Sequence, residues 1–308
     1  MKEQQTHSNL ASEGEKKSAY IAIIGRPNVG KSTLLNDLLG EKVAIVSNKP
    51  QTTRNRILGI LTKGNNQFVF LDTPGVFTPR NALGEYMAKT VDTSVQDSDA
   101  AVMVIDATKP LGATEEKLIV DLEKAKIPSI LAVNKTDLAG AEQIAVCLKQ
   151  YSGRYSFDAY VPLCAKNGKN VDVLLRECEK YLQPSPWFFP EDVATDQPER
   201  QLAAEIIREK ILRTLDKEIP HGVAVVIEEF KEEDGLARIR AEIFCEKNSH
   251  KGIIVGKNGE ELKRIGSYAR ADLEKLLGRK VYLNLWVKVK ENWRDSVRAV
   301  ANFGYNND

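Results

Sequence analysis

The sequence predicts two domains: an α/β domain with a mostly parallel sheet, followed by a smaller α+β domain. A chain of 308 residues exceeds one typical domain. In its first part, five short apolar runs each precede a polar or glycine-containing loop and then a helical pattern. Apolar runs without strict alternation are typical of strands buried on both faces. In its last part, two strands alternate between apolar and polar residues, which is typical of a sheet with one buried face.

The expected domain boundary is a proline-rich segment that starts after Gln183. Its four prolines can continue neither a helix nor a central strand, and its aromatic residues indicate a segment packed on a surface rather than a free tether. We therefore expect a disordered tail over 1–17, the α/β domain over 18–183, the linker over 184–199 and the α+β domain over 200–308.

Composition and charge narrow the function classes. The formal net charge of +1 means that the whole chain is not an electrostatic nucleic-acid binder, so any basic surface must be local. The four cysteines form no C-x-x-C pair and predict neither a zinc site nor a disulfide framework. No apolar run approaches the length of a membrane span. We expect a cytoplasmic monomer, and peripheral attachment to the cell membrane stays compatible with the sequence.

A phosphate-binding loop is predicted at Gly25–Ser32, which matches G-x-x-x-x-G-K-S between an apolar strand and the helix expected over 31–39. Its glycines let backbone N–H groups turn toward phosphate oxygens, and the helix N-terminus adds partial positive charge. Lys31 is expected to reach the β- and γ-phosphates, and the Ser32 hydroxyl to ligate Mg²⁺. The alternative is a chance glycine-rich turn, which the strand–loop–helix context disfavours.

Asp72-Thr73-Pro74-Gly75 follows the next apolar strand. A carboxylate at the carboxyl end of a strand is where the second Mg²⁺ contact belongs, and the Gly75 N–H can sense a γ-phosphate. Read alone, this motif is also a plausible turn. Its distance after the phosphate loop favours the functional interpretation.

Asn134-Lys135-Thr136-Asp137 follows a later strand and predicts a base-recognition loop. The Asp137 carboxylate can accept two hydrogen bonds from guanine N1–H and N2–H₂, a donor pair that adenine lacks. The aliphatic stem of Lys135 can lie along the base. The alternative is an exposed turn, but together with the two phosphate motifs the pattern predicts GTP and GDP as substrate and product.

These motifs, together with Gln51-Thr52-Thr53-Arg54, resemble the Era family of bacterial GTPases. The resemblance implies an α/β P-loop GTPase domain whose first switch loop spans 51–55. There, Thr53 or Thr52 ligates Mg²⁺ only when a γ-phosphate is present, and spacing does not choose between them. The family's last base-contacting loop is usually Ser-Ala-Lys and here reads Cys164-Ala165-Lys166. The Ala165 N–H is expected to contact guanine O6, while the supporting hydroxyl is lost at Cys164.

The resemblance also implies slow hydrolysis. Many GTPases place a glutamine where this chain has Val76, and an apolar side chain cannot orient water. Such enzymes commonly use K⁺ in place of an arginine finger, and Asn28 is the expected K⁺ ligand, although it could instead only cap the loop. The expected catalytic residues are Lys31, Thr53, Gly75 and Asn28. The expected nucleotide-binding residues are Gly25, Arg26, Pro27, Asn28, Val29, Gly30, Lys31, Ser32, Thr33, Asp72, Thr73, Pro74, Gly75, Val76, Asn134, Lys135, Thr136, Asp137, Cys164, Ala165 and Lys166.

The second domain carries a G-x-x-G at Gly256–Gly259 between two helical stretches. Its element order resembles a type II KH domain, whose G-x-x-G loop clamps the backbone of about four nucleotides. The segment from Lys247 to Lys290 contains eleven basic residues and four acidic ones, which gives it a positive net charge. We expect single-stranded RNA as the ligand. The expected RNA-binding residues are Lys251, Gly256, Lys257, Asn258, Gly259, Lys263 and Arg264.

By resemblance, the RNA is the 3′ end of 16S ribosomal RNA, and the role is biogenesis of the 30S subunit. The predicted function is a slow GTP-hydrolysing switch coupled to RNA binding. One alternative is an RNA-binding protein with a structural, non-cycling nucleotide site. An RNA-modifying enzyme lacks support, because no second catalytic constellation is present in the sequence.

Overall fold

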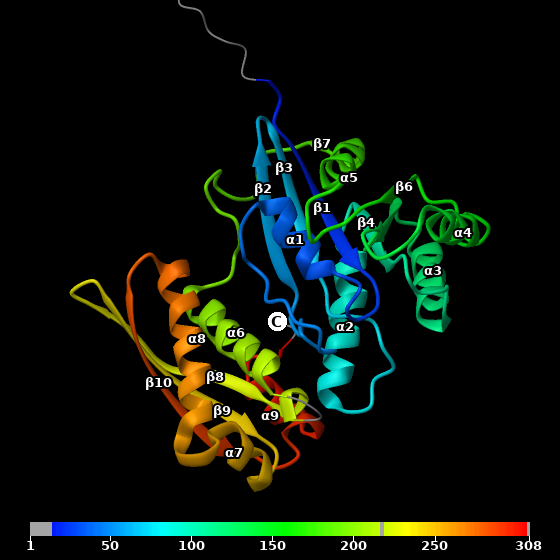
Figure 1. Cartoon of the computed structure of the whole chain (residues 1–308). Helices are drawn as coiled ribbons and strands as arrows, with labels where there is room; N and C mark the ends of the chain where they lie inside the picture. The colour runs from blue at the N-terminus through cyan, green and yellow to red at the C-terminus, as the bar shows by residue number, and fades with distance from the viewer. Residues whose placement is uncertain (1–13, 216–218, 307–308) are drawn as a thin grey trace, which may run out of the picture.

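The computed structural model describes residues 14–215 and 219–306, which form two domains (Figure 1). Most of the expected tail, residues 1–13, lies outside the described residues. The first strand, β1 (Lys17–Ile24), already begins at the last residue assigned to that tail. Within the described residues, no helix combines the length and the apolar character that a bilayer crossing requires.

The first domain is built on a sheet in the order β2-β3-β1-β4-β5-β6. Its other strands are β2 (Ile57–Lys63), β3 (Asn66–Asp72), β4 (Ala100–Asp106), β5 (Ser129–Asn134), β6 (Ala159–Pro162) and the short β7 (Gln183–Pro184). Only β2 against β3 and β7 against β1 pair antiparallel. The expected mostly parallel sheet is confirmed, and the parallel strands end at one edge, where α/β proteins place their ligands.

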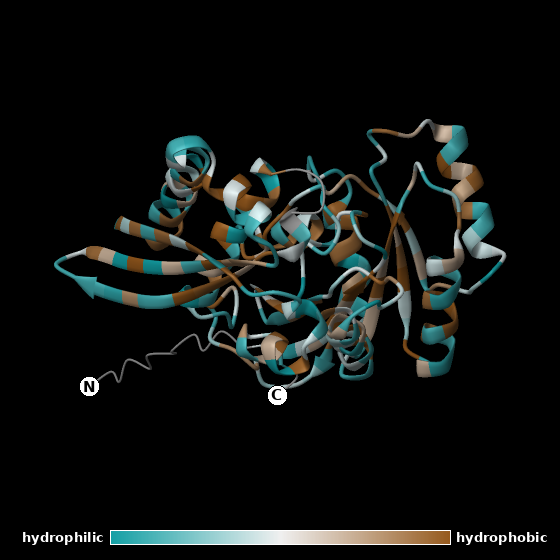
Figure 2. Cartoon of the chain, turned by 90° about the horizontal axis from the view of Figure 1, so that it is seen from below, coloured by the Kyte–Doolittle hydropathy of each residue, from teal (hydrophilic) through white to brown (hydrophobic). Residues whose placement is uncertain are grey.

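Helices cover both faces of this sheet. Helix α1 (Lys31–Leu39) and helix α5 (Val171–Cys178), which is followed by the 3₁₀ turn η1 (Glu179–Tyr181), pack on the face that carries Ile21 and Ile23. Helices α2 (Ala82–Gln96), α3 (Ala113–Ala125) and α4 (Ala141–Ser152) pack on the other face, together with Ala22 and Ile24. Because both faces are buried, the strands consist of nearly continuous apolar residues. Brown dominates the strands of this domain in Figure 2.

The linker is fixed to the edge of the sheet, as its aromatic residues predicted. The Gln67 side-chain oxygen accepts hydrogen bonds from Phe188 N at 2.8 Å and Phe189 N at 3.1 Å. Farther along, Ile60 N donates to Ala194 O at 2.8 Å. Helix α6 (Glu199–Thr214) takes over the last residue of the expected linker.

The second domain follows the predicted order of helix, two strands, two helices and a strand. Its elements are α6, β8 (Ala224–Glu233), β9 (Leu236–Cys245), α7 (Asn248–Val255), α8 (Glu260–Leu277) and β10 (Lys280–Val289). The sheet order is β10-β9-β8, with β10 parallel and β8 antiparallel to β9. The alternating side chains of β9 are buried from Ala237 to Cys245 under α6, α7 and α8, and the alternation is visible as coloured bands in Figure 2.

In the sequence, the apolar residues of 260–277 also predict that Leu276 packs against this core, together with Leu262, Ile265, Ala269 and Leu273, and this prediction is wrong for Leu276. Leu276 is 38% exposed, whereas its neighbour Leu277 is buried. The buried stripe of α8 runs through Ile265, Ala269 and Leu273 at steps of four residues, and the next step reaches Leu277.

The sequence also did not predict the last segment of the chain, which joins the two domains. The 3₁₀ helix η4 (Trp293–Asp295) and helix α9 (Val297–Asn302) bring Trp293, Val300 and Tyr305 against Leu83 and Met87 of α2. Two further 3₁₀ turns, η2 (Ile219–Gly222) and η3 (Lys257–Gly259), belong to the second domain. The segment over 293–305 thus lies between the domains (Figure 1).

Candidate nucleotide and RNA sites

The predicted phosphate loop connects β1 to α1. Glycine is required at one position within it and at one position in the loop that packs against it. Gly25 has φ 151°, and a Cβ there would lie 2.3 Å from Val104 O. A Cβ at Gly75 would lie 2.6 Å from the Pro27 Cα, so the loop after β3 approaches the phosphate loop backbone to backbone. The two predicted phosphate motifs therefore meet at one point, and a side chain at either glycine would separate them.

Lys31 is buried inside this loop. Its Nζ donates to Gly25 O and to Arg26 O, each at 3.0 Å. Burial lowers the pKa of Lys31 to about 8, and the nearby Asp72 carboxylate opposes that shift. An amine held in this way, with only carbonyls as partners, is prepared to receive a phosphate anion.

Three oxygen-bearing side chains converge beside the loop. Ser32 Oγ lies 2.5 Å from Asp72 Oδ2 and 2.8 Å from Thr53 Oγ1, and Thr53 Oγ1 lies 3.4 Å from Asp72 Oδ2. Thr52 Oγ1 instead donates to Lys49 O at 2.6 Å. The geometry therefore selects Thr53 from the two threonines that the sequence left open.

This trio fits Mg²⁺. Asp72 Oδ1 is buried and accepts no hydrogen bond from the described residues, which is costly for a carboxylate unless a cation lies nearby. Burial raises the pKa of Asp72 to about 6, although Lys31 and the two hydroxyls oppose the shift. A carboxylate with two hydroxyls is an oxygen donor set suited to Mg²⁺. Asp72, Ser32 and Thr53 would hold the ion, which would supply positive charge to the phosphates.

Asn134 ties the base-recognition loops together. Its Nδ2 donates to Val29 O at 2.8 Å, and its Oδ1 accepts from Ala165 N at 2.9 Å. The phosphate loop, the loop after β5 and the loop after β6 are thereby held in one register. The Ala165 N–H, which the resemblance predicts to contact guanine O6, donates to Asn134 Oδ1 in this structure.

The sequence interpretation missed Asp106 at the end of β4. Lys135 Nζ lies 2.8 Å from Asp106 Oδ2 and donates to Asn28 O at 2.7 Å. Although burial raises the pKa of Asp106, hydrogen bonds from Lys135 and Thr108 hold it below the usual value. The position of Asp106 at a strand end, like that of Asp72, was the signal that could have revealed it.

The departure at Cys164 is compensated locally. The Cys164 thiol donates to Asp137 Oδ1 at 3.2 Å, so it supports the carboxylate that is predicted to read the base, where the family usually has a hydroxyl. Thr136 Oγ1 donates to Leu163 O at 3.0 Å and anchors the same loop to the end of β6. The side chain of Lys166, the last residue of the Cys164-Ala165-Lys166 loop, is exposed to solvent.

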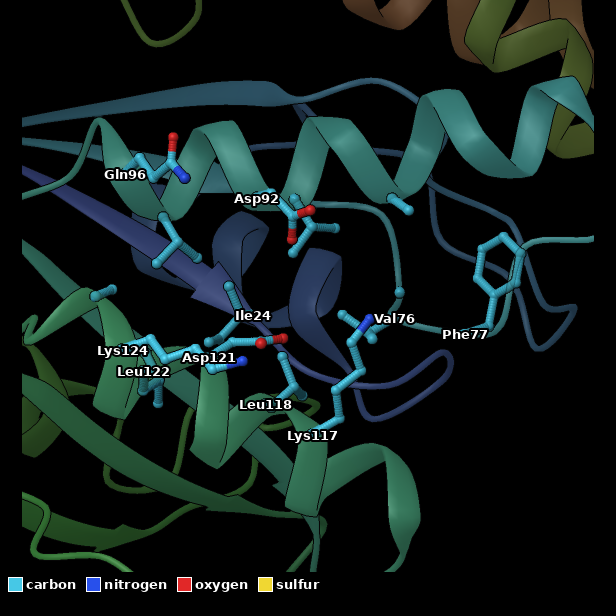
Figure 3. A pocket seen from close by; sticks show the side chains of 15 residues that line it. Ile24, Val76, Phe77, Asp92, Gln96, Lys117, Leu118, Asp121, Leu122 and Lys124 are labelled. Carbon is cyan, nitrogen blue, oxygen red and sulfur yellow. The ribbon is translucent and has the colours of Figure 1, made fainter.

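Three predicted nucleotide residues turn their side chains away from the phosphate loop. Arg26 forms an ion pair with Glu115 at 2.9 Å, and Thr73 Oγ1 donates to Ile23 O at 2.8 Å. Val76 packs against Ile24 and lines a cavity of about 310 Å³ between α2 and α3 (Figure 3). Arg26 and Thr73 contribute backbone and loop shape, and the Val76 side chain lies at the cavity.

The predicted RNA site forms a groove on the second domain. Gly256 has φ 74°, and a Cβ there would lie 2.6 Å from the Glu261 Cβ, so the G-x-x-G turn requires glycine. Lys257 and Asn258 are exposed at its tip. The groove runs from Gly259 along α8 to the free edge of β10, and it is lined by Leu262, Lys263, Gly266, Ser267, Arg270, Val281, Tyr282, Leu283, Asn284 and Leu285. Of the other predicted RNA residues, Lys251 is exposed and Arg264 pairs with Glu261 at 2.7 Å.

Comparison with known proteins decides the family. The model of the 50S ribosome-binding GTPase family matches residues 20–135, and the KH domain model matches residues 218–294. GTPase Era of Clostridioides difficile strain 630 is 50% identical over 94% of this chain and 99% of its own length. The chain belongs to the Era family of GTPases. GTPase Era of Ruminiclostridium cellulolyticum is 47% identical over 94% of this chain and 97% of its own length.

Solved structures of Era share the whole architecture. An Era in complex with MgGDPNP and nucleotides 1506–1542 of 16S ribosomal RNA matches 95% of this chain and 100% of its own at 40% identity, with a TM-score of 0.92. A variant of Aquifex aeolicus Era bound to GDP·AlF₄⁻ matches 94% of this chain and 100% of its own at 40% identity, with a TM-score of 0.91. The matches cover both domains, so this chain is a P-loop GTPase with an RNA-binding KH domain.

Proposed function

We propose that this Era GTPase is a slow GTP-dependent switch that binds single-stranded RNA at the 3′ end of 16S ribosomal RNA during assembly of the 30S subunit in the cytoplasm. The observation that carries the proposal is the groove beside the G-x-x-G turn, in one chain with the nucleotide site. The Era complex that contains nucleotides 1506–1542 of 16S ribosomal RNA supports this choice of ligand.

The groove has the features that splayed single strands need. The G-x-x-G turn offers close backbone approach and carries the exposed Lys257 at its tip. Lys263 and Arg270 supply positive charge along the α8 wall of the groove. The opposite wall is the edge of β10, where unpaired backbone groups can bond base edges. Duplex RNA does not expose its base edges in this way, so the groove favours single-stranded RNA.

Replacing Lys257 and Asn258 together by aspartate is expected to weaken binding of an RNA spanning nucleotides 1506–1542 by roughly tenfold or more, because two carboxylates would meet the phosphates that the turn clamps. GTP affinity should stay as in the wild type. Fluorescence anisotropy of labelled RNA measures the effect, with Lys149→Asp on the exposed side of α4 as the matched control. An unchanged RNA affinity in the double variant would remove the groove from the proposal.

Crosslinking of the GTP-bound protein followed by RNA sequencing tests the assembly role. We expect one cluster of crosslinks at the 3′ end of 16S ribosomal RNA. Crosslinks scattered over messenger RNAs would contradict the role in 30S assembly and leave only a general RNA-binding switch.

We also propose that K⁺ assists hydrolysis at Asn28. Asn28 Nδ2 donates to Asn48 O at 2.9 Å, so the oxygen of the same amide is the atom left to ligate a cation next to the phosphate loop. Positive charge at the leaving oxygen stabilises the charge that develops during phosphoryl transfer. No glutamine stands after Gly75 to supplement it.

Hydrolysis is therefore expected to be about tenfold or more faster in KCl than in NaCl at equal ionic strength, since one well-placed charge is worth that much or more. Asn28→Gly should abolish the difference, because glycine accepts the left-handed φ of 64° at this position and lacks the amide oxygen. Release of phosphate under single-turnover conditions measures the rate, and Asn167→Gly in an exposed turn is the control. Equal rates in the two salts would refute the K⁺ role. Hydrolysis at background level, even with RNA present, would favour the non-cycling alternative.

A further inference from the structure

The first switch loop (residues 51–55) is held from outside its own domain. The Arg54 side chain leaves the first domain and is only 1% exposed. Its Nη1 donates to Val223 O at 2.7 Å and to Tyr305 Oη at 3.0 Å, and its Nη2 donates to His221 O at 2.9 Å. The guanidinium also lies 5.7 Å from the Trp293 ring centre and 5.6 Å from that of Tyr305. All of these partners belong to the second domain.

A second arginine holds the loop from the other side of Thr53. Arg208 of α6, also 1% exposed, donates to Gln51 O at 3.4 Å and to Thr52 O. Glu205, one turn earlier on the same helix, fixes the guanidinium with a hydrogen bond from Nε at 2.8 Å. Arg208 can reach both carbonyls because a guanidinium carries several donors in a fixed planar fork.

The segment before the loop is held by the same helix. Glu209 accepts hydrogen bonds from Val46 N at 3.0 Å and from Lys42 Nζ at 2.7 Å. Arg213 Nε donates to Val46 O at 3.0 Å. Helix α6 therefore bonds the backbone of the first domain at Val46, Gln51 and Thr52. These residues precede Thr53, which forms the trio with Ser32 and Asp72.

We infer that the second domain is part of the GTPase centre, with Arg208 and Arg54 as positioning residues for Thr53. Arg208 holds the two backbone carbonyls that precede Thr53. Arg54, the residue directly after Thr53, is anchored in the second domain by its own side chain. With the backbone on both sides of Thr53 held in this way, its hydroxyl lies 2.8 Å from Ser32 Oγ. A buried guanidinium that loses its acceptors is costly, so the contacts hold the loop and the second domain together as a unit.

The arrangement predicts a reciprocal effect between the two domains. GTP, through its γ-phosphate, holds Thr53 at the trio and thereby favours the interdomain contacts, whereas GDP offers no such hold. A ligand that moves the second domain would in turn change the position of Thr53. This inference rests on the GTPase activity and the interdomain contacts, and RNA binding does not enter its test.

The test compares full-length Arg208→Ala and Arg54→Ala with the wild type in the absence of RNA. We expect kcat to fall about tenfold or more, the size of effect known for misplaced active-site groups. The Mg²⁺ concentration at half-maximal rate should rise, while GDP affinity should stay within about twofold. Arg200→Ala is the matched control, because Arg200 lies on the same helix and donates to Ile227 O and Glu228 O, both within the second domain.

Where an alanine variant lowers the Tm, Arg208→Lys and Tyr305→Phe carry the test, because both preserve the packed volume. A lysine ammonium lacks the planar fork with which Arg208 bonds Gln51 O, Thr52 O and Glu205 together. Phenylalanine removes one acceptor of Arg54. Each variant should therefore lower kcat and raise the Mg²⁺ midpoint in part. Wild-type kcat and Mg²⁺ midpoint in all four variants would overturn the inference. A loss of GDP affinity equal to the loss of kcat would also overturn it, because that outcome indicates general damage to the nucleotide site.

Discussion

Asp137→Asn is expected to weaken GTP binding by about a thousandfold or more and to shift preference toward xanthosine nucleotides. The carboxylate accepts two hydrogen bonds from guanine, and a site built for such bonds strongly rejects a mismatched partner. An asparagine amide donates where the carboxylate accepted, and xanthine presents a carbonyl oxygen at the position of the guanine amino group. Asp137→Asn therefore weakens the binding of guanine nucleotides and strengthens the binding of xanthine nucleotides.

Competition of labelled GDP against unlabelled GDP and XDP at fixed Mg²⁺ measures this preference. Asp172→Asn, on the exposed surface of α5, is the control. The Cys164 thiol, now 3.2 Å from Asp137 Oδ1, can still donate to an asparagine oxygen, so the loop should stay folded. An unchanged ratio of GDP to XDP affinity would show that Asp137 does not read the base.

Thr53→Ala is expected to lower kcat by about a hundredfold, with little effect in Thr52→Ala. Only Thr53 places its hydroxyl at 2.8 Å from Ser32 Oγ, whereas the Thr52 hydroxyl donates to Lys49 O. Loss of one pre-positioned group at a developing charge costs about two orders of magnitude in rate. The threonine pair is a demanding comparison, because both residues lie in one loop and differ mainly in the direction of the side chain.

Single-turnover hydrolysis at several Mg²⁺ concentrations distinguishes the two threonines. Thr53→Ala should require more Mg²⁺ for its residual rate, and its GDP affinity should be close to wild type because GDP has no γ-phosphate. Equal losses in both variants, or a larger loss in Thr52→Ala, would contradict the geometric choice of Thr53.

The sequence predicted most of the nucleotide site because parallel strands bring their carboxyl ends together. Asp72, Asn134 and the phosphate loop are far apart in the chain, yet each directly follows an apolar strand, so their meeting could be expected. Asp106 obeys the same rule but lacks a recognisable motif. The choice between Thr52 and Thr53 depends on the direction of a loop, which spacing alone does not determine.

The contacts between the domains could not be predicted. Arg54 bonds Tyr305 across 251 residues, and Arg208 bonds Thr52 across 156. No local periodicity encodes such partners, and a buried arginine looks in sequence like any surface arginine. The element order of the second domain was confirmed, whereas its last helix, too short for a clear apolar stripe, was missed.

The anchoring of the linker determines how strongly the domains need to hold each other. The last linker contact with the sheet is at Ala194, and α6 begins at Glu199, so only residues 195–198 lie between them. Four extended residues span at most about 14 Å. A tether this short keeps the second domain at a local concentration of millimolar order around the switch loop. Contacts that would be too weak between separate molecules can therefore form here, break with a change of nucleotide, and form again without the partner ever diffusing away.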